Sequence, residues 1–133
     1  MDEQLLLDEI SMPSTEINNV TLADDGGTVT LNFALPPRHR GAERGITFDG
    51  VRAYRHRAES HCTAWHVEAY DTLTEVRESA WVADLRGATP DDQRDLFPMH
   101  HYMIYLDSAG CYEVVAADWS FLTDASAADG AAG

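Results

Sequence analysis

Strict alternation of apolar and polar residues beside a glycine turn restricts the N-terminal third of this chain to a β-hairpin. Apolar residues occupy every second position from Val29 to Leu35, which is typical of a strand with one buried face. The run is preceded by Asp24-Asp25-Gly26-Gly27, whose glycines can adopt the positive φ that a tight hairpin turn requires. The sequence therefore predicts two antiparallel strands, over 16–23 and 28–35.

A second hairpin is predicted near the C-terminus, where segments 100–106 and 111–117 flank a turn at Asp107-Ser108-Ala109-Gly110. Both segments carry apolar residues on both faces, which is typical of central strands covered on each side. Between the two hairpins, residues 46–56 alternate again. Their Asp49-Gly50 pair indicates a bulge within that strand.

The segment 58–76 gives two conflicting signals. Its apolar residues recur at helical spacing, yet its threonines, valines and aromatic residues favour strands. We interpret it as two short strands, over 62–68 and 70–77. Near the N-terminus, residues 4–10 could form one or two helical turns.

Short helices are predicted between residues 79 and 97. Ser79 is a suitable N-cap for a helix over 80–86. Thr89-Pro90 is a typical start for a second short helix, which ends near Leu96.

Together these elements predict one β-rich α+β domain, either a twisted antiparallel sheet or a two-sheet sandwich, with one or two short helices at 79–97. A length of 133 residues suits a single domain. We expect an acidic lead-in over 1–15, the globular domain over 16–123 and a disordered acidic tail over 124–133. The residues expected in the core are Phe33, Phe48, Val51, Trp65, Trp81, Ile104, Leu106, Val114 and Trp119.

Charge is distributed unevenly along the chain. There are 23 acids and 9 bases, every base is Arg, and the net charge is −14. Residues 1–37 hold seven acids and no base, residues 38–57 hold six arginines and two acids, and residues 58–133 hold fourteen acids and three arginines. Net charge influences the choice of partner rather than the fold. So acidic a chain disfavours the phosphate backbone of duplex nucleic acid and favours a basic protein partner.

The arginine-rich segment offers a candidate anion-binding site at Arg52, Arg55, Arg57 and His56. On a strand, Arg55 and Arg57 project to one face, and His56 projects to the other with Tyr54. Two interpretations stay open. These arginines either pair with carboxylates on neighbouring strands or bind an anion such as a phosphate or a carboxylate.

Cysteines and histidines offer a candidate metal site. Cys62 and His66 share a face whether their segment is a strand or a helix. With Cys111 and either His100 or His101, they could form a tetrahedral zinc site. The spacing matches no zinc family, however, and thiols in apolar surroundings are more often buried hydrophobic groups. No known catalytic or phosphate-binding motif is present, so no catalytic residue and no cofactor is predicted.

The compartment expected for this chain is the cytoplasm. Its N-terminus is acidic, opposite to a signal peptide, and no stretch approaches the roughly 20 apolar residues that span a bilayer. The two cysteines lack CxxC spacing, which favours reduced thiols. No association with a membrane is expected.

Three motifs carry a resemblance to known proteins: Phe48-Asp49-Gly50-Val51, Ser79-Ala80-Trp81, and the run from Asp107 to Val114. Their order and spacing resemble small, mostly uncharacterised bacterial domains that include the immunity-type proteins of polymorphic toxin systems. The resemblance implies a non-enzymatic inhibitor that binds one cognate toxin, often a basic nuclease, through an acidic surface. The alternative function is a small accessory enzyme or metalloprotein that uses the histidine and cysteine residues.

Overall fold

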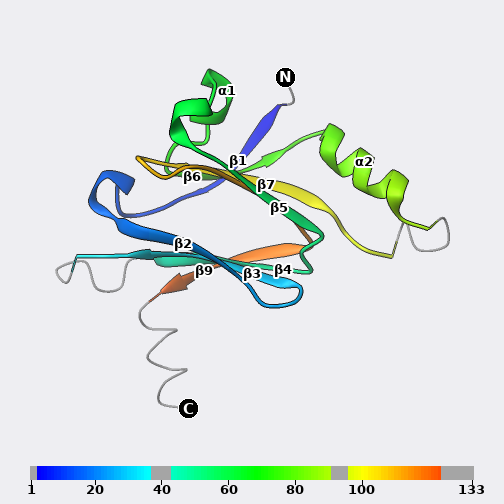
Figure 1. Ribbon diagram of the computed structural model, residues 1–133, viewed down its shortest axis with the longest axis horizontal. Helices are drawn as coiled ribbons and strands as arrows, with labels where there is room; N and C mark the ends of the chain where they lie inside the picture. The colour runs from blue at the N-terminus through cyan, green and yellow to red at the C-terminus, as the bar shows by residue number, and fades with distance from the viewer. Residues whose placement is uncertain (1–2, 37–42, 91–95, 124–133) are drawn as a thin grey trace, which may run out of the picture.

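The computed structural model describes residues 3–36, 43–90 and 96–123. Two antiparallel sheets pack face to face, and both α-helices lie on the outer face of the five-stranded sheet (Figure 1). This confirms the predicted β-rich α+β fold and selects the sandwich. Neither helix in the described residues has the length and apolarity that crossing a membrane requires.

The five-stranded sheet contains, in spatial order, β1 (Gln4–Glu9), β6 (Thr72–Val76), β7 (His100–Leu106), β8 (Gly110–Ala116) and β5 (Ala53–Arg57). The four-stranded sheet contains β2 (Asn18–Asp24), β3 (Thr28–Ala34), β4 (Glu43–Asp49) and β9 (Asp118–Thr123). The helical elements are η1 (Ser14–Glu16), η3 (Glu59–His61), α1 (Ala64–Val67) and α2 (Ala80–Ala88).

Both predicted hairpins are confirmed. In the turn between β2 and β3, Gly26 and Gly27 have φ of 57° and 117°, and Asp25 N–H donates to Thr28 O at 2.8 Å. The alternating burial along β3 matches its alternating sequence. The strands β7 and β8 lie inside the five-stranded sheet, and nearly all of their residues are buried, as covering on both faces requires.

Two long bent strands join the sheets. One runs through β4 and β5 and the other through β8 and β9, and they pair along both halves. At the bend, Arg52 N–H donates to Val115 O at 2.8 Å, and Ala117 N–H donates to Asp49 O at 2.9 Å. The Asp49-Gly50 bulge predicted from the sequence is therefore the corner where the chain passes from one sheet to the other.

Two local predictions are wrong. The expected strand at 62–68 contains α1, because Thr63 and His66 form a capping box that starts a helical turn there. Residues 4–10, for which helical turns were considered, contain β1 instead, paired with β6. The prediction for 70–77 is confirmed by β6, and that for 80–86 by α2, whose N-cap Ser79 accepts the N–H of Val82 at 3.2 Å.

Two other predictions cannot be compared with the fold. Most of the second helix predicted at 89–96 falls on residues 91–95, and the expected disordered tail is residues 124–133. Both ranges lie outside the described residues.

The main core fills the space between the two sheets. Of the residues expected there, five are buried: Phe33, Phe48, Ile104, Leu106 and Val114. The other four are only half-buried: Val51, Trp65, Trp81 and Trp119. A second, smaller cluster lies on the outer face of the five-stranded sheet, where Trp65 and Cys62 pack against Met103, Tyr105 and Cys111.

Replacing Gly50 with Ala is expected to lower the free energy of unfolding by about 1–3 kcal/mol. A Cβ at this position would lie 2.9 Å from the Cβ of Ala117, and the backbone φ is +65°. Urea titration measures the change. The control is Gly87→Ala in α2, where a Cβ meets no atom within 4 Å. There we expect no loss, or a gain of up to about 1 kcal/mol. Equal losses in the two variants would contradict the conclusion that the bend between the sheets requires glycine at position 50.

Candidate functional site

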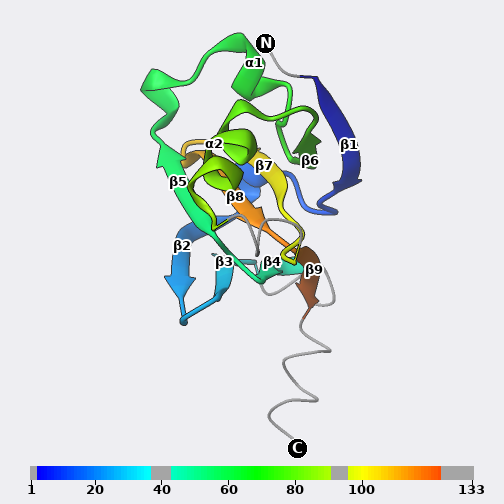
Figure 2. The same ribbon diagram turned by 90° about the vertical axis from the view of Figure 1, so that its right-hand side faces the viewer.

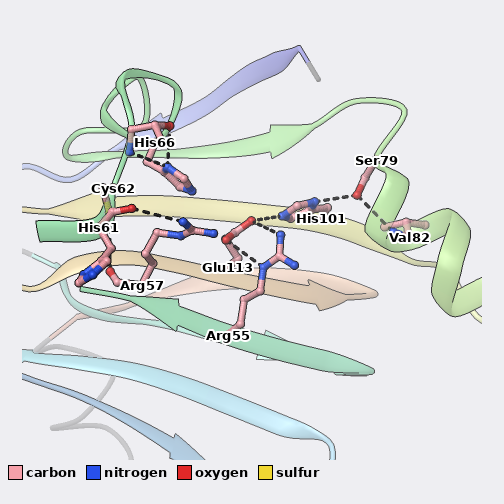
Figure 3. Close-up of polar contacts among 10 residues, drawn as sticks. Arg55, Arg57, His61, Cys62, His66, Ser79, Val82, His101 and Glu113 are labelled. Carbon is pink, nitrogen blue, oxygen red and sulfur yellow. Dashed lines mark hydrogen bonds and ion pairs between the residues drawn. The ribbon is translucent and has the colours of Figure 1, made fainter. Parts of the chain in front are cut away.

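The candidate site is the outer face of the five-stranded sheet between α1 and α2 (Figure 3). The pleat places Arg55 and Arg57 of β5 on this face together with Glu113 of β8, which lies directly opposite Arg55 in the register. His101 of β7 reaches the same face beside them. Three neighbouring strands thus contribute titratable side chains to this face.

Four side chains form a continuous chain of hydrogen bonds across this face (Figure 3). Ser79 Oγ lies 2.7 Å from His101 Nδ1, and His101 Nε2 lies 2.7 Å from Glu113 Oε1. Arg55 donates to both oxygens of Glu113 at 3.0 Å. The exposed fractions of Ser79, His101 and Glu113 are 8%, 3% and 1%. We name this set the Ser79–Arg55 relay.

Glu113 is ionised at the centre of the relay. Burial alone would raise its pKa, but the hydrogen bonds from His101 and Arg55 and the charge of Arg55 outweigh burial and lower the pKa to about 2. A buried carboxylate with one partner removed would be strongly destabilising. The relay is therefore built around the need to compensate this one charge.

Trp81 of α2 covers the relay. Its ring lies 4.0 Å from the guanidinium carbon of Arg55 and edge-on to His101, with centroids 5.1 Å apart. No residue of α2 is fully buried, so the helix has little apolar anchoring of its own. The Trp81 contacts and the Ser79–His101 hydrogen bond join the start of α2 to the sheet.

The α1 end of the face carries Arg57 and His66. Arg57 Nη1 donates to the carbonyl of His61 at 3.3 Å. His66 is 5% exposed, and its Nδ1 accepts the backbone N–H of Thr63 at 3.0 Å. Burial, and then the positive charge of Arg57, lower the pKa of His66, which keeps its ring neutral at pH 7. A cavity of about 410 Å³ lies here, lined by Arg55, His56, Arg57, Ala58, His61 and Glu113.

The structure divides the predicted anion-binding set. Arg55 and Arg57 share the outer face, as the sequence indicates. His56 points elsewhere, with Nε2 at 2.6 Å from Ala109 O and its ring against Tyr112. Arg52 stacks on Phe97, 3.9 Å from the ring centroid, at the corner between the sheets.

The predicted metal set is not brought together as a whole. Cys62 packs against the cluster that contains Cys111, and burial raises the pKa of both thiols. His100 hydrogen-bonds Glu75 at 2.8 Å and lies one residue out of phase with His101 on β7, so it faces away from these cysteines. In the described part of the chain, no three His, Cys, Asp or Glu side chains are grouped so that they could hold a metal ion.

Sequence reasoning missed the relay, although one signal for it exists. Glu113 is the only charged residue in the run from Gly110 to Ala116, a segment with apolar residues on both faces. A carboxylate in a strand covered on both sides must have charged or hydrogen-bonding partners. That rule demands partners for Glu113 but does not identify them.

Comparison with known proteins gives no relative from which a function could be transferred: no family model, no curated protein and no solved structure matches the chain.

The relay predicts a specific loss of stability in acid. Because the folded pKa of Glu113 is lowered from 4.5 to about 2, its contribution is complete above about pH 5 and disappears as the pH falls towards 2. That difference corresponds to on the order of 3 kcal/mol. In urea titrations, Glu113→Gln should be less stable than the wild type by about this amount at pH 7, and the gap should close near pH 2.

The matched control is Glu75→Gln, which removes the partner of a half-exposed histidine, His100. Its gap from the wild type should stay below about 1 kcal/mol at every pH, because the pair is solvated. A gap for Glu113→Gln that does not change with pH would contradict the assignment of the acid transition to Glu113.

Proposed function

We propose that this protein binds a basic macromolecular partner, in the manner of an immunity-type inhibitor, through the edge strand β1. The observation that carries the proposal is an apolar strand edge bordered by acids. Leu5 and Leu6 are 44% and 66% exposed, and exposed Glu3, Asp8 and Glu9 flank them. Within the described residues, no strand pairs with the outer side of β1.

The charge asymmetry of the sequence supports this choice of surface. β1 and β5 lie at opposite edges of the five-stranded sheet (Figure 2). Residues 1–37, which include β1, contain no base, whereas Arg55 and Arg57 belong to β5. One edge of the sheet is thus acidic and the other carries cations, so a basic partner is attracted to β1 and repelled from β5.

An extended segment of the partner can add to β1 as a further strand. Free N–H and C=O groups at a sheet edge supply affinity, and the side chains beside them supply specificity. Two copies of this chain would bring their acids together at such an edge. This repulsion disfavours self-association and leaves a basic segment as the occupant.

The binding partner to test is the protein encoded by the adjacent gene, as the resemblance to immunity-type proteins suggests. A basic, toxin-like neighbour supports the proposal, and a biosynthetic operon counts against it. We expect the association rate to fall about tenfold or more between roughly 50 and 500 mM NaCl, because salt screens the acidic edge. A rate that does not respond to salt would remove the electrostatic argument.

Leu6→Arg is expected to weaken this binding at least about tenfold, because it places a cation on the acidic edge and removes an apolar contact. Leu96→Arg is the matched control, since Leu96 is 67% exposed and lies outside β1. Both variants should unfold within about 0.5 kcal/mol of the wild type, because both positions are on the surface. Equal binding by the two variants would exclude β1 as the contact.

A second candidate function, a small accessory hydrolase, is favoured by one part of the relay. With a neutral ring, His101 accepts the hydroxyl proton of Ser79 at Nδ1 and donates Nε2–H to Glu113. This is the hydroxyl–imidazole–carboxylate order of acyl-transfer nucleophiles. A cavity of about 350 Å³ lies beside it, lined in part by Ser79, His101 and Val82. The Ser79 hydroxyl would attack the carbonyl carbon of a small ester while His101 takes its proton. His101 would return that proton to the alcohol that leaves as the ester bond breaks, and water would then hydrolyse the acyl-serine in the same way.

A fluorophosphonate probe tests this second candidate. An activated Ser79 would be labelled in the folded wild type, and labelling and ester hydrolysis would both disappear in Ser79→Ala. Ser60→Ala serves as the control, because Ser60 is exposed and outside the relay. Absence of labelling in the wild type would contradict the hydrolase and leave Ser79 as the cap of α2.

A further inference from the structure

We propose that Arg57 and His66 form a binding site for the phosphate or carboxylate group of a small molecule, at the α1 end of the outer face. The site goes beyond the proposed function, because it lies at the β5 side of the sheet rather than at β1. The sequence left open whether these arginines pair with carboxylates or bind an anion. We infer that Arg55 does the first and Arg57 the second.

Arg55 and Arg57 differ in the way their charges are compensated. Arg55 makes two hydrogen bonds to Glu113 at 3.0 Å. Arg57 makes one long hydrogen bond, 3.3 Å, to the His61 carbonyl, and no carboxylate of the described residues lies within ion-pair distance of it. A guanidinium has five N–H donors, so most of those of Arg57 stay available to a ligand.

The Ser79–Arg55 relay explains why Glu113 does not neutralise Arg57. Oε1 accepts from His101 and Arg55, and Oε2 accepts from Arg55. The geometry of the carboxylate is thereby fixed towards Arg55, and its charge is already compensated. The charged groups that act on His66 are two arginines and one glutamate, so its surroundings are cationic in a chain of net charge −14.

His66 supplies a second donor aimed at the same place. Its Nδ1 accepts from the N–H of Thr63, so in the neutral ring the proton is on Nε2. Among the described residues, Nε2 has no hydrogen-bond acceptor, although His66 is only 5% exposed. In Figure 3 this edge of the ring points towards the guanidinium of Arg57. The fully buried side-chain atoms without a partner in the described residues do not include His66 Nε2, so this unpartnered N–H stays accessible, and an anionic oxygen could accept from it and from Arg57.

The ligand class follows from size and donor geometry. The cavity beside Arg57 measures about 410 Å³, and its lining includes Arg55 and His61. An oxyanion with at least two acceptor oxygens matches the planar fork of Arg57 and can also accept from His66 Nε2. A phosphate and a carboxylate both meet this requirement.

The experiment titrates His66 by NMR in the folded protein. Its imidazole resonances are followed from pH 4.5 to 8 with and without inorganic phosphate or acetate, while NaCl keeps the ionic strength constant. Burial, Arg57 and Arg55 lower the pKa of His66, and Glu113 raises it. A bound anion would stabilise the charged imidazole and so raise this pKa. We expect saturable shifts of the His66 resonances and a pKa higher by about half a unit or more.

Arg57→Gln should abolish the response, and Arg57→Lys should weaken it by loss of the fork. Arg52→Gln is the matched control, because Arg52 also lacks a carboxylate partner among the described residues but stacks on Phe97 away from the site. A response to phosphate alone assigns a phosphate site, and a response to both anions assigns a general oxyanion site. No saturable shift in the wild type up to about 20 mM, or an unchanged response in Arg57→Gln, would overturn the proposal. If Arg57→Gln does not fold, the wild-type titration and Arg57→Lys decide.

Discussion

The buried carboxylate of Glu113 is the interaction on which the outer face of this protein depends. It lies 1% exposed at the centre of β8, in a strand with neighbours on both sides. A charge in that position is tolerated only when its oxygens are satisfied, and three different elements supply the donors or hold them. β5 contributes Arg55, β7 contributes His101, and the start of α2 contributes Ser79, which fixes the His101 ring. The position of α2 is thus a consequence of compensating one charge.

The two bent strands make this arrangement possible. Because β4 continues into β5 and β8 continues into β9, one pair of strands belongs to both sheets, and the register of one half fixes the register of the other. The pairing of Arg55 with Glu113 is therefore coupled to the pairing of Phe48 with Trp119 at the other side of the corner. A one-residue slip would turn Glu113 into the core between the sheets. Gly50 is needed at the bend for two reasons. Its backbone φ is +65°, and a Cβ at this position would lie 2.9 Å from the Cβ of Ala117.

Hydrophobic periodicity correctly predicted the strands whose own residue pattern shows which of their faces are buried. The alternation at Val29–Leu35 specifies a strand with one buried face, and the doubly apolar run at Cys111–Ala117 specifies a strand covered on both faces. Both hairpins are correct. Failures occurred where a local hydrogen bond or a distant pairing decides. The capping of α1 by Thr63 and His66 outweighs the β propensity of its residues, and Gln4–Glu9 is a strand because β6 offers it an edge. The candidate site mixes both cases: the shared face of Arg55 and Arg57 follows from the pleat, but which of them meets a carboxylate depends on the register with β8.

That register also separates the two arginines into different roles, which composition could not do. Both belong to the only basic segment of an acidic chain, and both project from the same face of the same strand. One lies opposite Glu113 and the other opposite Cys111, whose thiol carries no compensating charge because burial raises its pKa. Arg55 is therefore paired with a carboxylate, whereas Arg57, two residues further along the same strand, has no carboxylate partner among the described residues. At the far edge of the same sheet, β1 carries acids and exposed leucines with no base nearby in sequence. The acids of β1 and the arginines of β5 thus lie at opposite edges of one sheet, so the two binding sites that we propose, for a basic partner and for an anion, do not share a strand.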